Sequence, residues 1–233
     1  MTPALHDRVI VVTGGFGALG RALAAVLAEQ GARVALLDRA PPAAGLPGGE
    51  RTLLLGGVDL GDEQAAQAAF AQVAQRWQRI DGLVNVAGGF AWETVTDGSL
   101  VTWDRLYAMN LRSAVAASKA ALPHLSTDGR GRIVNIGAQA ALKAAAGMGA
   151  YAASKAGVMR FTEALAEELK DRHITVNAVL PSIIDTPANR ADMPTAAFDR
   201  WVTPVALGRV IAFLLSDDAA AITGACLLVA GRV

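Results

Sequence analysis

The sequence has few of the residues that build disulfides and metal centres. It contains one cysteine, Cys226, which has no partner for a disulfide within the chain. Its three histidines, His6, His124 and His173, are far apart and show none of the spacings of metal ligands. We therefore expect no disulfide framework and no metal site, which suits a reducing environment.

The sequence also lacks an excess of charge and long hydrophobic runs. Its 21 Lys and Arg residues balance 21 Asp and Glu residues and form no basic run, which argues against nucleic-acid binding through phosphate contacts. No stretch of 18 apolar residues is free of Gly, Pro and charge, so we expect no membrane-spanning helix. The start, M-T-P-A-L-H-D-R, does not resemble a signal peptide. We expect a soluble, cytoplasmic protein that acts on a small molecule.

Short apolar runs instead alternate with longer helical patterns along the whole chain. Apolar residues make up 53% and charged residues 18%, which excludes intrinsic disorder. The pattern predicts strands at residues 8–13, 33–38, 51–58, 82–87, 131–137, 174–180 and 226–230. It predicts helices at residues 18–30, 62–79, 100–122, 149–170 and 204–215.

This alternation predicts an α/β Rossmann fold, because strands that alternate with helices form parallel sheets with right-handed crossovers. We expect one domain over residues 1–233, with a doubly wound parallel sheet of about seven strands and helices on both faces. The Pro- and Gly-rich segment 41–49 is expected to be a surface loop. Residues 182–200 carry Pro187 and Pro194 without a clear period, so we expect a short substrate lid with room for a short helix.

A glycine-rich turn joins the first strand to the first helix. Residues 13–20 read T-G-G-F-G-A-L-G, in which Gly15, Gly17 and Gly20 match the pattern G-x-G-x-x-G. Such glycines allow a tight turn and a close approach to a pyrophosphate, which the helix N-terminus also attracts. An ordinary strand–turn–helix connection is the alternative, but the position after a strand favours a dinucleotide site.

An acidic residue lies where a dinucleotide site needs one. Asp38 follows Gly20 by 18 residues at the end of the second strand, where a carboxylate accepts hydrogen bonds from the adenosine ribose. It would repel a 2′-phosphate, whereas Arg39 beside it could hold one. We expect NAD(H) to be favoured over NADP(H).

Other candidate residues follow the third and fourth strands. Asp59 and Leu60 end the third strand, and Asn85, Ala87 and Gly88 end the fourth. Ligands of open α/β sheets bind at this edge. Turn chemistry is the alternative explanation, since Asp is a good helix N-cap and Gly ends strands.

Tyr151 and Lys155 lie four residues apart at the start of a predicted helix and therefore share a face. The chain has two tyrosines and four lysines, so a chance Tyr-x-x-x-Lys is expected only about 0.03 times. A free phenol has a pKa near ~10, and a neighbouring ammonium favours the phenolate. A fall of ~3 units needs about 4 kcal/mol, which a partly desolvated cleft can supply. We expect Tyr151 to act as a general acid and base.

Together these residues resemble the short-chain dehydrogenase/reductase family over nearly the whole chain. The likeness rests on the 13–20 turn, Asp38, Asp59, N-V-A-G at 85–88, Asn110, R-I-V-N-I at 132–136, Y-A-A-S-K at 151–155 and N-A-V-L-P-S at 177–182. It implies that Tyr151 moves the proton, that Lys155 also binds the nicotinamide ribose, and that Asn110 holds a relay water through its helix backbone. It implies that Thr186 bonds the carboxamide of the cofactor. The other cofactor contacts would be Gly14, Gly15, Phe16, Gly17, Leu19, Asp38, Arg39, Asp59, Leu60, Asn85, Ala87, Gly88, Pro181 and Ile184.

The sequence departs from the family where a catalytic serine is usual. Ala138 occupies that position, 13 residues before Tyr151, and cannot donate a hydrogen bond to a substrate carbonyl. Either Gln139 replaces the serine, or the substrate needs no such donor.

One branch of the family, the dihydropteridine reductases, resembles this chain at the same departures. The chain resembles this branch in V-A-G-G-F at 86–90, in G-A-x-A-A-L at 137–142 and in the string A-V-L-P…D-T-P-x-N-R-x-x-M-P-x-A-x-F-x-x-W over 178–201. The likeness implies a flat substrate. Candidate contacts are Gln139, Trp92, Met148, Arg190 and Trp201, with core packing or a solvated arginine as the alternatives.

Three functions remain open at this point. We expect first an NADH-dependent reductase of a quinonoid dihydropterin or a similar flat heterocycle, and second an alcohol dehydrogenase or carbonyl reductase for a small substrate. The third is a non-catalytic dinucleotide-binding protein. Family members commonly assemble through the helices at 111–122 and 152–169, which implies a homodimer or homotetramer.

Overall fold

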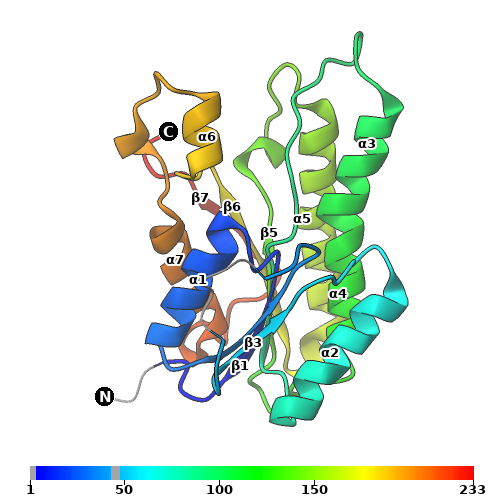
Figure 1. Cartoon of the computed structure of the whole chain (residues 1–233), viewed down its shortest axis with the longest axis vertical. Coiled ribbons are helices and arrows are strands. Elements are labelled where there is room, and N and C mark those ends of the chain that lie inside the picture. The colour runs from blue at the N-terminus through cyan, green and yellow to red at the C-terminus, as the bar shows by residue number, and fades with distance from the viewer. Residues whose placement is uncertain (1–3, 43–47) are drawn as a thin grey trace.

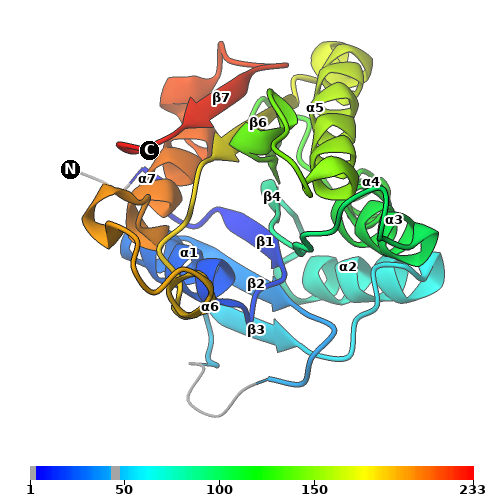
Figure 2. The same cartoon turned by 90° about the horizontal axis from the view of Figure 1, so that it is seen from above.

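The structure, a computed structural model, describes residues 4–42 and 48–233. Seven parallel strands form one sheet in the order β3-β2-β1-β4-β5-β6-β7 (Figures 1 and 2). The chain winds outward from β1 to β3 and then returns to β4 on the other side of β1. The strand order therefore reverses between β1 and β4, and ligands of open α/β sheets bind at this crevice. The strands are β1 (Val9–Thr13), β2 (Arg33–Leu37), β3 (Thr52–Leu55), β4 (Gly82–Asn85), β5 (Arg132–Ile136), β6 (Thr175–Pro181) and β7 (Cys226–Val229).

Helices cover both faces of this sheet, as Figure 2 shows from above. One face packs against α1 (Ala18–Glu29) and α7 (Pro204–Leu215), and the other against α2 (Glu63–Trp77), α4 (Ser113–Ala121) and α5 (Gly149–Leu169). Strand residues divide between the two cores by alternation: in β1, Ile10 and Val12 join the first core and Val9 and Val11 the second. All four are fully buried, so the central strand is apolar on both faces. The predicted α/β Rossmann fold is confirmed.

Most predicted elements begin or end one or two residues from the observed bounds, and three differences have a local structural cause. The third strand ends at Leu55 instead of residue 58, because Gly56 follows and Gly57 turns the chain with φ of +74°. The helix predicted at 62–79 begins at Glu63, since the Asp62 carboxylate caps it by accepting from the N–H of Gln64 at 2.8 Å. Residues 43–47 of the predicted surface loop lie outside the described part of the chain.

The third difference concerns the helix predicted over 100–122. It consists of α3 (Leu100–Tyr107), a π-helical turn (Ala108–Arg112) and α4. The Ser113 hydroxyl donates to the carbonyl oxygen of Met109 at 2.6 Å within this turn. π-Turns inside helices often mark functional sites. This one carries Asn110 to the edge of the sheet where β4 ends.

Residues 182–200, the predicted lid, contain α6 (Pro187–Asp192) and one 3-10 turn (Phe198–Arg200). α6 lies above the N-terminal end of α1 and is separate from α3 across the top of the molecule (Figure 1). Among the described residues, no helix is long and apolar enough to cross a membrane.

Candidate active site

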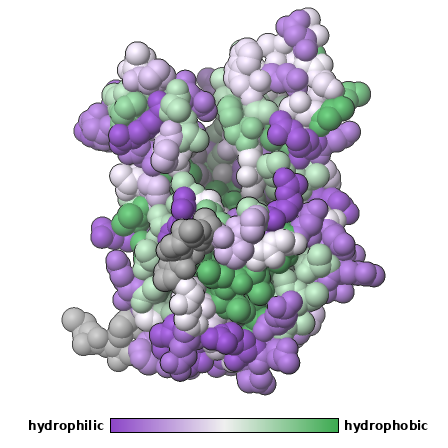
Figure 3. Space-filling model, viewed as in Figure 1, coloured by the Kyte–Doolittle hydropathy of each residue, from purple (hydrophilic) through white to green (hydrophobic). Residues whose placement is uncertain are grey.

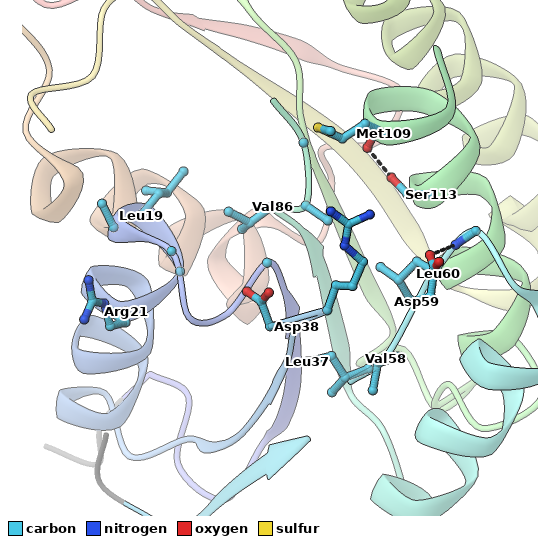
Figure 4. Close-up of a pocket in the computed structure, with 18 of the residues that line it drawn as sticks. Leu19, Arg21, Leu37, Asp38, Val58, Asp59, Leu60, Val86, Met109 and Ser113 are labelled. Carbon is cyan, nitrogen blue, oxygen red and sulfur yellow. Dashed lines mark hydrogen bonds between the residues drawn. The ribbon is translucent and has the colours of Figure 1, made fainter. Parts of the chain in front are cut away.

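A cavity of about 850 Å³ lies at the carboxyl edge of the sheet. It appears as a hollow between the two upper lobes in Figure 3. Six segments line it: the turn after β1, the end of β2, the end of β4, the loop before α2, the α3–π-turn segment and the start of α6 (Figure 4). Its lining residues include Gly14, Gly17–Arg21, Leu37–Arg39, Val58–Gly61, Val86–Gly88, Arg105, Ala108, Met109, Ser113 and Thr186–Ala188.

The glycine turn is packed too closely for side chains. A Cβ on Gly20 would contact the carbonyl oxygen of Gly14 and lie 2.7 Å from the Cα of Gly15. A Cβ on Gly15 would lie 2.7 Å from Cβ of Leu36 in β2. Gly14 has φ of +60°, which glycine adopts most readily. Only Gly17 is exposed and faces the cavity, and the nearest atom to its Cβ position would be 3.4 Å away.

Asp38 ties the glycine turn to the end of β2. One carboxylate oxygen accepts from the N–H of Phe16 at 3.0 Å, and the other accepts from the N–H of Ala40 at 3.0 Å. The Phe16 ring is buried in the core, so this residue contributes its backbone at the turn. Asp38 and Arg39 both line the cavity, where the sequence predicts the adenosine ribose.

Asp59 makes the turn that the alternative explanation requires, and it also lines the cavity. Its carboxylate accepts from the N–H of Gly61 at 2.8 Å. Asn85 differs from the sequence-based expectation. Its amide is buried and donates to Asn135 at 2.8 Å and to Ser118 at 3.1 Å, so its side chain points into the sheet and away from the cavity.

Lys155 and Tyr151 lie on α5 beside the Gly88 end of the cavity. The buried ammonium of Lys155 donates to the carbonyl oxygen of Ile136 at 2.7 Å, and a Cβ on Gly88 would lie 3.4 Å from Nζ. The Tyr151 ring contacts Phe90 edge to face, with ring centroids 5.0 Å apart. Lys155 therefore lies against Gly88, which lines the cavity, and Tyr151 lies against Phe90 two residues further along, although neither reacting residue is itself among the lining residues.

Burial dominates the titration of this pair. It raises the pKa of the Tyr151 phenol to about 12 and lowers the pKa of the Lys155 ammonium to about 8. The chain alone thus shifts the pKa of Tyr151 in the direction opposite to the predicted one, because burial is its only cause and the Lys155 ammonium makes no opposing contribution. At neutral pH the phenol is protonated, which suits a proton donor.

Asn110 links the β4 loop to α5. Its side-chain oxygen accepts from the N–H of Gly89 at 2.7 Å, and its amide donates to the carbonyl oxygen of Gly89 at 3.1 Å and to Ser154 at 3.0 Å. The Ser154 hydroxyl donates to the carbonyl oxygen of Tyr151 at 2.7 Å. The Asn110 side chain is therefore a clamp between the residue before Phe90 and the turn that carries Tyr151.

The predicted substrate contacts lie in different places. Ala138 is buried at the end of β5, and Gln139 begins the 3-10 turn that follows. Met148 precedes α5 at its N-cap position. Trp92 is 62% exposed and its indole N–H donates to the carbonyl oxygen of Ala146 at 3.0 Å.

Arg190 and Trp201 contact residues of their own segment. Arg190 forms a bidentate ion pair with Asp185, and its guanidinium lies over the Phe198 ring, 4.7 Å from the ring centroid. Trp201 is buried and contacts Phe198 edge to face. Both side chains therefore contact other residues of the segment predicted as the lid.

Thr186 lines the cavity and caps α6 by accepting from the N–H of Asn189 at 3.2 Å. The predicted cofactor residues that are not among the cavity-lining residues are Gly15, Phe16, Asn85, Tyr151, Lys155, Pro181 and Ile184. Sequence reasoning missed Arg21, Arg105, Met109 and Ser113. The position of Arg21 directly after the glycine pattern is a usable signal, whereas the other three lie on α3, the π-turn and the start of α4 and have no such signal.

Comparisons with known proteins agree with this geometry. The short chain dehydrogenase family model matches residues 8–196. The chain belongs to the short-chain dehydrogenase family. The 2-(S)-hydroxypropyl-CoM dehydrogenase 3 of Xanthobacter autotrophicus is 33% identical, with 99% of this chain and 98% of that protein covered. The cyclopentanol dehydrogenase of Comamonas sp. is 32% identical, with 97% of each covered.

Solved structures of the family share the whole fold. A short-chain dehydrogenase/reductase from Brucella melitensis, titled a glucose/ribitol dehydrogenase, superposes with a TM-score of 0.90 at 30% identity, with 99% of this chain and 98% of that chain covered. A 3-ketoacyl-(acyl-carrier-protein) reductase of the same organism, solved with NADH, superposes with a TM-score of 0.88 at 28% identity, with 97% of this chain and 98% of that chain covered.

The chain is thus an NAD(P)-dependent oxidoreductase of this family. The residues present fit a dinucleotide, because the turn leaves no space for Cβ atoms at Gly15 and Gly20 and directs exposed Gly17 at the cavity. Gly17 and the N-terminus of α1 would hold the pyrophosphate, and Asp38 the adenosine ribose.

Proposed function

We propose that the enzyme interconverts a secondary alcohol and its ketone with NAD(H). The observation that carries this proposal is the pair Tyr151 and Lys155 on the first turns of α5, next to the cavity. When bound, the nicotinamide supplies or accepts the hydride at the carbinol carbon. Tyr151 gives its phenolic proton to the ketone oxygen in reduction and takes it back in oxidation. Relatives named as dehydrogenases of cyclopentanol and of meso-2,3-butanediol support this class.

Asp38 supports NAD(H) as the favoured cofactor. Its carboxylate lies at the cavity wall, fixed by two backbone N–H groups, where a 2′-phosphate would meet a negative charge. Arg39 is exposed beside it and reduces the discrimination.

The test is oxidation of NADH, and separately of NADPH, with a panel of ketones. Tyr151→Phe should abolish turnover without changing the affinity for NADH. The chain offers a matched control, Tyr107→Phe, because Tyr107 is the only other tyrosine and is 56% exposed on α3. Equal activity in Tyr151→Phe and Tyr107→Phe would refute the proposal.

Ala138 favours a second candidate, reduction of a quinonoid dihydropterin or a similar flat heterocycle. The residue offers no hydroxyl beside the substrate, and such a substrate accepts hydride without a carbonyl oxygen to polarise. The sequence places this function first, and the names of the relatives favour the alcohol. Ala138→Ser separates the two: a restored donor should raise kcat/KM for ketones about tenfold and leave a quinonoid dihydropterin unaffected.

We further propose that the protein is cytoplasmic and works as a homodimer or homotetramer. α3 exposes several apolar side chains, including Leu100, Val101 and Tyr107, which are 80%, 71% and 56% exposed. Light scattering of the purified protein tests the assembly, and a monomeric mass would refute it.

A further inference from the structure

Phe90 is an exposed aromatic residue held against the reacting tyrosine. Its side chain is 54% exposed, yet its ring meets the Tyr151 ring edge to face at 81° with centroids 5.0 Å apart. A large apolar side chain that remains exposed beside a reacting group leaves apolar surface available for a ligand.

The backbone beside Phe90 is rigid. Asn110 hydrogen-bonds both the N–H and the carbonyl oxygen of Gly89, so the peptide before Phe90 is held on both sides. A Cβ on Gly89 would contact the sulfur of Met109, which brings this loop close to the π-turn. The position of the Phe90 ring is therefore set by the π-turn as well as by Tyr151.

Trp92 is held against the turn that precedes α5. Its indole donates to the carbonyl oxygen of Ala146 and its ring lies over Gly147, where a Cβ would collide with it. The N–H of the next residue, Glu93, donates to the carbonyl oxygen of Gly147 at 2.8 Å. Gly147 precedes Tyr151 by four residues, so two exposed aromatic rings flank the entry to α5.

We propose that Phe90 and Trp92, the aromatic ledge, bind a planar ring of the substrate beside Tyr151. This inference rests on the proposed function and refines it: the enzyme prefers ring-bearing ketones and alcohols to small aliphatic ones. Flat rings bury apolar area on such side chains and pair with them edge to face or in offset stacks.

The test compares two diketones with the same reacting group, 2,3-butanedione and 1-phenyl-1,2-propanedione. Phe90→Leu keeps apolar bulk but removes the planar ring. It should raise KM for the phenyl diketone about tenfold and change KM for 2,3-butanedione less than about twofold. Phe213→Leu is the matched control, because Phe213 is 43% exposed on α7, on the other face of the sheet.

An equal fold-change in KM for both diketones would overturn the inference, since Phe90 would then only orient Tyr151. No change in either would also overturn it. So would a change in oligomeric state of Phe90→Leu by light scattering, because the ledge would then be an interface between copies.

A binding measurement separates this inference from the proposed function. If the wild type reduces neither diketone, the proposed function fails, and calorimetric titration of the enzyme–NADH mixture with acetophenone still tests the ledge. About tenfold weaker binding to Phe90→Leu supports the ledge, and equal binding refutes it.

Discussion

Two glycines of the turn after β1 have different physical roles, and replacing each by alanine separates them. Gly20 is buried, and its Cβ would press on backbone atoms of Gly14 and Gly15 that cannot rotate away. Gly17 is exposed in the cavity, and its φ of −72° and ψ of 171° suit any residue. Gly20→Ala should therefore affect folding, and Gly17→Ala should affect cofactor binding.

The contact distances set the magnitudes. A Cβ at 2.7 Å from the Cα of Gly15 forces a backbone shift, and such overpacking costs about 1–3 kcal/mol. The gain in helix propensity from alanine offsets roughly 0.5–1 kcal/mol of this cost. For a chain of 233 residues each kcal/mol lowers Tm by about 2–4 °C, so we expect Gly20→Ala to melt several degrees lower.

Gly17→Ala meets one atom at 3.4 Å, an ordinary contact, so its stability should stay within about 0.5 kcal/mol of the wild type. Its methyl group would hold the pyrophosphate away from the backbone N–H groups of the turn and weaken their hydrogen bonds to it. Hydrogen bonds to a charged group are worth about 1.5–3 kcal/mol each, so the Kd for NADH should rise at least about tenfold.

Thermal unfolding and fluorescence titration with NADH test both variants. The physical reasoning fails if Gly20→Ala melts with the wild type, or if Gly17→Ala binds NADH as tightly as the wild type.

Three further predictions follow from named contacts. Burial lowers the pKa of Lys155 to about 8, so above pH 8 the unfolded chain binds more protons than the folded one, and the free energy of unfolding rises by about 2–3 kcal/mol up to pH 10. Urea unfolding of Lys155→Met should lose this rise, and an unchanged rise would contradict the prediction. Asn110→Ala removes both hydrogen bonds to Gly89 and one to Ser154, and should cost about 2–4 kcal/mol in chemical denaturation and lower kcat, whereas wild-type values would rule out the clamp. Asp38→Ala should raise the NADPH-to-NADH ratio of kcat/KM about tenfold, and a constant ratio would show that Asp38 does not discriminate.

Local patterns were sufficient for most of the fold. The apolar run of β1 and the glycine spacing each depend on a few neighbouring residues, so the sequence predicts them well. The parallel sheet follows from the alternation of strands and helices. The early end of β3 was missed, because Gly56 and Gly57 continue an otherwise apolar run.

The site was harder to predict where it depends on distant parts of the chain. The π-turn has no signal in A-M-N-L-R, and it decides that Asn110 reaches Gly89 and Ser154. The direction of Asn85 depends on Asn135 and Ser118, 50 and 33 residues further along. The pKa of Tyr151 depends on burial, which a four-residue spacing cannot show.

The lid shows the same limit. Its short helix was expected, but the sequence cannot show that Arg190 pairs with Asp185 or that Trp201 turns inward onto Phe198. The sequence therefore predicts the short helix of this segment, whereas the contacts of Arg190 and Trp201 within it follow only from the structure.

The central claim is that Tyr151 transfers the proton in an NAD(H)-dependent reaction. Steady-state oxidation of NADH with the ketone panel, in the wild type, Tyr151→Phe and Tyr107→Phe, tests it most directly. We predict that the wild type and Tyr107→Phe reduce the same ketones, and that Tyr151→Phe loses about 10²-fold or more in kcat with an unchanged Kd for NADH. Retained turnover in Tyr151→Phe would contradict the account.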